Sequence, residues 1–190
     1  MATVDITSLR KTINPKALQN LAYGAALSKL NRIKSETLKD FDTHEVTVEL
    51  KAGEDANSTS LPDGNLFSFI GFTKGETPTQ EVREVLEAQI SIQNKPAITQ
   101  NQNIYTFSFP AAFPSKQDIE AISPMPSRWS SGSWVTRIEK GISGLQHYIY
   151  GVFQSSFSST GLQVEGKVRK DVYKPRKYIS EILKKALAKF

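Results

Sequence analysis

The 190-residue chain contains no cysteine and only two histidines, so several kinds of site are excluded at once. Without thiols there is no disulfide framework, thiolate zinc site, iron–sulfur cluster or cysteine nucleophile. His44 and His147 are not spaced as a metal-binding pair, and no G-x-S-x-G nucleophile elbow is present. We therefore expect a protein that is not an enzyme, with no metal and no cofactor, in which both histidines are structural or surface residues.

Long apolar runs and phosphate-binding glycine patterns are also missing. No segment approaches the roughly 18 apolar residues of a membrane span, and no secretory signal is evident, so we expect no membrane association. Residues 141–144 (GISG) lack both the Walker lysine and the Rossmann spacing. An acidic cluster lacks the spacing of a calcium loop and is interpreted as solvated; it comprises Asp40, Asp42, Glu45, Glu54 and Asp55.

Positive charge is concentrated at the C-terminal end. Residues 164–190 hold nine Lys or Arg and three acids, whereas residues 1–163 carry a net charge of −1, so the +5 of the chain lies in this end. Such asymmetry indicates either a solvated lysine-rich helix face or a contact with an anionic partner. The candidate residues for that contact are Lys174, Arg176, Lys177, Lys184, Lys185 and Lys189.

Helix signals occur in four places. Asn14-Pro15 starts a helix that should run to about Lys39, and Thr77-Pro78-Thr79-Gln80 forms a capping box for a middle helix. Ser115 and Asp118 can cap one further turn. A last helix is expected from about Pro175, with lysines opposite its apolar stripe.

Alternating residues predict strands over 45–51, 104–109 and 134–138, and residues 147–150 are a further candidate. Residues 65–72 (NLFSFIGF) are expected to thread the core as a helical turn or a strand. These elements indicate one α+β domain over residues 1–190, with an antiparallel or mixed sheet packed by the long N-terminal helix, the middle helix and the basic C-terminal helix. Long loops are expected near residues 53–64, 123–133 and 153–163.

Aromatic and basic residues flank two of these Ser/Gly-rich loops. The tryptophans can be core residues, anchors of a subunit interface, or platforms for nucleic-acid bases. The candidate interface residues are Arg128, Trp129, Trp134, Phe153 and Phe157.

The order of several segments resembles the neck or tail-completion class of virion proteins of long-tailed bacteriophages. A long first helix is followed by GNLFSFIGF (64–72), a TP-capped helix, SRWSSGSW (127–134), RIEKGISGLQHYIYG (137–151), TGLQ (160–163) and KYISEIL (177–183). The serine-rich SRWSSGSW is similar to the loop before the central strand of that class. The resemblance covers most of the chain.

The resemblance implies a structural protein that forms a six- or twelve-fold ring at the head–tail junction of the virion after synthesis in the host cytoplasm. Its partners would be copies of itself and other neck, portal-adaptor or tail-tube proteins, with non-specific DNA contact in the lumen. A tail terminator that caps the tube is the near alternative. A small nucleic-acid-binding protein that uses the basic C-terminal helix is the rival from another class.

Overall fold

The structure, a computed structural model, describes residues 15–55, 65–93, 95–101, 104–126, 131–142 and 174–190. In chain order the elements are α1 (Pro15–Thr43), α2 (Glu45–Ala52), the 3-10 turn η1 (Gly53–Asp55), α3 (Leu66–Ile70), α4 (Pro78–Gln89), β1 (Ser91–Ile92), β2 (Ala97–Asn101), β3 (Ile104–Ser108), β4 (Ala111–Ala112), α5 (Lys116–Ala121), α6 (Trp134–Lys140) and α8 (Ile179–Lys189). The α+β class is confirmed.

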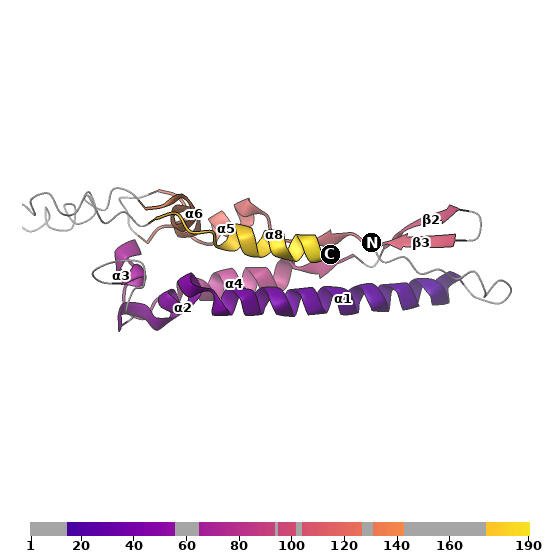
Figure 1. The fold of residues 1–190 in the computed structure, drawn as a ribbon, viewed down its shortest axis with the longest axis horizontal. Coiled ribbons are helices and arrows are strands. Elements are labelled where there is room, and N and C mark those ends of the chain that lie inside the picture. The colour runs from indigo at the N-terminus through magenta and orange to yellow at the C-terminus, as the bar shows by residue number, and fades with distance from the viewer. Residues whose placement is uncertain (1–14, 56–64, 94, 102–103, 127–130, 143–173) are drawn as a thin grey trace, which may run out of the picture.

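Helix α1 is the longest element of the structure, because its 29 helical residues span about 43 Å. Helices α4 and α8 both pack against it. In Figure 1 the β2–β3 hairpin lies at the end where α1 begins, and α3 and α6 lie at the opposite end. The chain therefore brings its first and last described helices side by side and leaves the hairpin at one tip.

The core lies toward the end of the molecule that holds α2, α3 and α6. Phe41 of α1, Trp134 of α6 and Tyr178, which immediately precedes α8, are each at most 2% exposed. The remaining side chains of this cluster come mainly from α2, α3, α4, α6 and α8: Val46, Leu50, Leu66, Phe67, Ile70, Val82, Leu86, Ile119, Val135, Ile138, Ile142, Ile179 and Ile182. Helix α8 is thus a part of the core and not an appended tail.

The described strands form two separate two-stranded sheets, both antiparallel. Strand β1 pairs with β4, and β2 pairs with β3 so that Ile98 lies opposite Phe107. The prediction of a strand over 104–109 is confirmed by β3. The expected antiparallel pairing is present, but as two small sheets and not as one layer covered by helices.

The strand predicted over residues 45–51 is wrong, because this segment is helix α2. Its apolar residues also fit a helical face: Val46 and Leu50, four apart, are buried, whereas Val48 is 52% exposed. His44 caps the start, and Gly53 ends the helix with a φ of 70°, a left-handed value that favours glycine.

The strand predicted over residues 134–138 is wrong for a similar reason. Trp134, Val135 and Ile138 are all buried, which is the i, i+1, i+4 pattern of a helix. The Ser133 hydroxyl accepts a hydrogen bond from the backbone N–H of Thr136 and so caps α6. Ser133 is also 2.6 Å from the buried Ser123 hydroxyl, which ties the two ends of the intervening loop together.

The predicted helix starts are confirmed with differences in detail. Helix α1 extends one turn beyond Lys39, to Thr43, and α4 has Pro78 in its first turn, although the Thr77 side chain makes no capping hydrogen bond. The Ser115–Asp118 capping box is present. Residues 65–72 contain a helical turn, α3, and the last helix begins four residues after Pro175. The strand candidate at 147–150 and the loop near 153–163 lie outside the described residues.

Candidate functional site

Of the five proposed interface residues, one is buried and four lie outside the described residues. Trp134 is 2% exposed and packs edge-on against Phe72, with ring centroids 5.9 Å apart. It is therefore a core residue in this chain, which is the first of the roles that its sequence allowed. Arg128, Trp129, Phe153 and Phe157 lie outside the described residues.

Three of the proposed anion-binding residues are instead paired with acids of their own chain. Arg176 forms an ion pair with Glu45 of α2, and Lys189 reaches Glu36 of α1 at 2.7 Å. Lys185 pairs with Glu181 at 3.0 Å. The Lys189 hydrogen bond holds the pKa of Glu36 below its usual value. The pairs of Arg176 and Lys189 fasten the two ends of the α8 segment to α2 and α1, whereas the Lys185–Glu181 pair lies within α8.

The other three lysines are differently placed. Lys174, Lys177 and Lys184 are exposed, and none of them forms an ion pair within the described residues. Fewer cations are therefore free to contact an anionic partner than the sequence indicated.

Tyr178 lies where the last helix enters the core. Its ring is fully buried between Phe41, His44 and Trp134, with centroid distances of 6.0, 4.8 and 6.4 Å. Its hydroxyl is 2.7 Å from the hydroxyl of Thr47, which is also fully buried. Tyr178 thus joins α8 to α1, α2 and α6, and its polar atom is satisfied inside the core.

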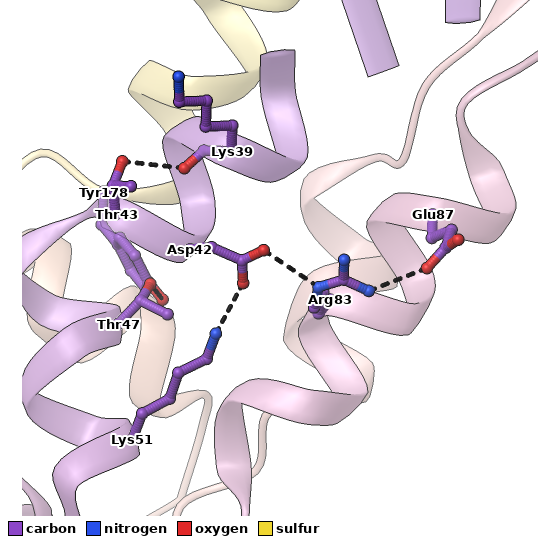
Figure 2. Close-up of polar contacts among 8 residues, drawn as sticks. All are labelled: Lys39, Asp42, Thr43, Thr47, Lys51, Arg83, Glu87 and Tyr178. Carbon is purple, nitrogen blue, oxygen red and sulfur yellow. Dashed lines mark hydrogen bonds and ion pairs between the residues drawn. The ribbon is translucent and has the colours of Figure 1, made fainter. Parts of the chain in front are cut away.

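A second junction is built around the carboxylate of Asp42, near the end of α1 (Figure 2). Lys51 of α2 donates to one oxygen at 2.7 Å, and Arg83 of α4 donates to the other at 3.3 Å. Arg83 continues to Glu87, one helical turn further along α4, at 3.0 Å. One carboxylate therefore bridges three helices.

Partial burial and these two cations act on Asp42 in opposite directions. Burial is the largest single influence and opposes ionisation, but the hydrogen bonds and the positive charges of Lys51 and Arg83 together outweigh it and lower the pKa. The same hydrogen bond with Asp42 is the main cause of the raised pKa of Arg83. The Asp42 carboxylate therefore stays ionised, and because both of its oxygens are bound by cations it is not free to act as a general base.

The Asp42 junction borders an open groove of about 450 Å³ between α1 and α4. Lys34 and Lys39 line it together with the two charged partners, Asp42 and Arg83. This groove has the charge to hold a small anion weakly. Its lining shows no arrangement of nucleophile, base and orienting group.

His44 caps α2 in its neutral form. The Val46 backbone N–H donates to its Nδ1 at 3.2 Å, so Nδ1 carries no hydrogen and Nε2 donates to the Lys177 carbonyl oxygen at 3.2 Å. Burial lowers the pKa of His44, and this effect exceeds the opposing influence of Lys177, Glu45 and Glu181. His44 is therefore a structural residue that links α2 to the start of α8.

A pocket of about 330 Å³ lies at the other side of α4. Apolar side chains from the loops around α3, α5 and α6 line it, and two carboxylates lie at its rim. The residues are Phe72, Pro78, Ile122, Met125 and Trp134, with the acids Glu76 and Glu81.

Sequence reasoning missed the Asp42 junction and this pocket. Arg83 and Glu87 are spaced as a helical ion pair, which is visible in the sequence. Asp42 and Arg83, in contrast, are 41 residues apart, and nothing local distinguishes Asp42 from the other acids around it.

Comparisons with known proteins did not identify a family for this chain. No family model matches the chain, and no match was found among curated proteins or solved structures. Within the described ranges, no group of three or more His, Cys, Asp or Glu could hold a metal ion. None of the helices described is both long and apolar enough to cross a membrane.

Replacing Asp42 by Asn should weaken the junction of α1, α2 and α4. We expect Asp42→Asn to lower the free energy of unfolding by about 1 kcal/mol at pH 7, because two charge-assisted hydrogen bonds become weaker. The lowered pKa means that this stabilisation is present above the ordinary carboxyl pKa of 3.8 and is lost as the pH falls through the lower folded value.

Urea unfolding at pH 7 and pH 3 measures this effect. Asp55→Asn is the matched control, since Asp55 is exposed and makes no ion pair within the described residues. Equal losses in the two variants would contradict a bridging role for Asp42.

The protonation of His44 should destabilise the fold. A histidine whose folded pKa is lowered contributes its full stability above the unfolded value near 6.5 and loses it as the pH falls from there to the folded pKa. We therefore expect stability to decline between pH 7 and pH 5, before the carboxylates titrate. Thermal unfolding across this range measures the decline.

His44→Asn separates capping from titration, because Asn also caps helices but does not ionise. The variant should lose most of the decline between pH 7 and pH 5. A decline of unchanged size would assign it to other groups.

Proposed function

We propose that this chain is a non-catalytic structural subunit that assembles into a ring of six or twelve copies. The resemblance of its sequence supports a setting in the neck or tail-completion region at the head–tail junction of a tailed bacteriophage. A terminator that caps the tail tube is the near alternative, and both would use copies of the chain as partners.

The observation that carries the assembly proposal is the β2–β3 hairpin. Its two strands pair with each other, and within the described residues neither outer edge has a further strand. Figure 1 shows the hairpin at one tip of the molecule, past the ends of α4 and α8 and at the end where α1 begins. Isolated two-stranded hairpins are marginally stable, and free edges promote pairing with other chains. Such an arm is suited to a subunit whose neighbours cover it.

Exposed apolar side chains at the same end support the proposal. Ile98 of β2 is 54% exposed, and Leu21, near the start of α1, is 72% exposed. Single exposed apolar residues are common on protein surfaces, but Ile98 lies on the arm itself and Leu21 lies near the start of α1, at the same end of the molecule. A neighbouring subunit would remove both from water.

The nucleic-acid rival is weaker for a physical reason. Affinity for DNA rises with the number of phosphates that Lys and Arg neutralise. Arg176, Lys185 and Lys189 already neutralise acids of the same chain. Three of the six candidate cations are therefore already paired with acids of the same chain.

Sedimentation of the purified chain over a range of concentrations tests the proposal. We expect closed oligomers of six or twelve subunits, and Ile98→Thr should raise the dissociation constant roughly tenfold, because one buried Ile contributes about 1.5–3 kcal/mol. Threonine keeps the β-branch, so the hairpin should persist.

Val48→Thr provides the matched control, since Val48 is equally exposed at 52% but lies on α2. A chain that stays monomeric at every concentration would contradict the proposal. So would a reconstruction of virions that places the chain away from the head–tail axis.

A further inference from the structure

The pocket beside α4 is lined by both apolar side chains and two carboxylates. Its lining includes Phe72 and the largely buried Trp134, together with the acids Glu76 and Glu81. Both rim acids are exposed, and neither forms an ion pair with a lysine or arginine of the described residues. Glu76 accepts a hydrogen bond from the Thr73 backbone N–H, which leaves its second oxygen available. This pocket fits an apolar side chain that has a cation beside it.

The outer face of α8 has the complementary chemistry. Ile179, Ile182 and Ala186 are buried on the inner face, whereas Leu187 is 56% exposed. Lys184 lies one turn before Leu187, on the same side of the helix, and is also exposed. It forms no ion pair in the described part of the chain. The exposed side chains of Leu187 and Lys184 therefore lie next to each other on the outer face of α8.

Helix α8 cannot bring this face to the pocket of its own chain. Its N-terminal end is held by the Arg176–Glu45 ion pair and by the buried ring of Tyr178, and its C-terminal end by the Lys189–Glu36 pair. Between these points its inner face is packed against α1 and the core. The Lys184–Leu187 face is therefore directed outward, into the solvent.

We propose that the pocket rimmed by Glu76 and Glu81 receives the Lys184–Leu187 face of α8 from a second copy of this chain. The two patches of one subunit are complementary in charge, and the pocket, of about 330 Å³, accommodates a leucine side chain. A contact between unlike patches is head-to-tail and closes into a ring when the rotation allows. This inference rests on the proposed function, which requires such a repeating contact.

A mixing experiment with two complementary variants tests the contact. Glu81→Lys impairs the pocket and leaves the α8 face intact, whereas Lys184→Ala with Leu187→Ser impairs the face and leaves the pocket intact. All three positions are exposed, so both proteins should remain folded, with only a small loss of stability from a lysine in the first turn of α4. We expect each variant alone to associate at least tenfold more weakly than the wild type.

Mixing the two variants should give a 1:1 complex of twice the 21.1 kDa chain mass that does not grow further. One intact face then meets one intact pocket, and the impaired pair ends the assembly. Glu84→Lys is the matched control, because Glu84 lies on the same helix, outside the pocket lining, and should leave assembly unchanged.

The outcomes separate this inference from the proposed function. If the wild type forms closed oligomers and both variants retain them, the inference fails while the proposed function stands. If each variant is monomeric but the mixture does not pair, the two patches do not meet each other and the inference fails. If the wild type itself never associates, both fail.

Discussion

The ring of Tyr178 occupies the point where the last helix meets the rest of the core. It lies among Phe41 of α1, His44 at the start of α2 and Trp134 of α6, and its hydroxyl meets that of Thr47. These partners come from segments up to 137 residues away in sequence, so the contact joins the last helix to the first two helices and to α6. A buried aromatic side chain of this size contributes several kcal/mol. The arrangement of the other helices depends on this docking.

The same docking decides what the basic C-terminal end can do. A net charge of +6 over residues 164–190 first indicated an anionic partner outside the chain. With α8 in the core, Arg176 and Lys189 compensate Glu45 and Glu36 instead. What remains for a partner is a narrower face that contains Lys184 and Leu187. The acidic and apolar pocket of a ring neighbour would suit that face better than a DNA phosphate backbone. The phosphates could pair with Lys184 but provide no apolar surface for Leu187.

Capping chemistry made three of the seven described α-helices predictable from the sequence. Pro15, Pro78 and the Ser115–Asp118 pair each mark a helix start through local geometry, and all three starts are observed. The alternation over 45–51 and 134–138 was misleading, because a short apolar run fits both periods. Burial decides between them, and it depends on distant partners such as Tyr178. The Asp42–Arg83 contact and the pocket beside α4 were unpredictable for the same reason, since each joins segments that only the fold brings together.

Hydrogen exchange on Tyr178→Phe tests most directly whether this ring holds the helices as one unit. The substitution keeps the aromatic ring and leaves the Thr47 hydroxyl buried without its tyrosine partner, at a cost of about 1–3 kcal/mol. We expect the slowest amides of α1, α2, α6 and α8 to lose protection by the same free energy, because they open together. A loss confined to α8, with α1 and α6 protected as in the wild type, would contradict the account.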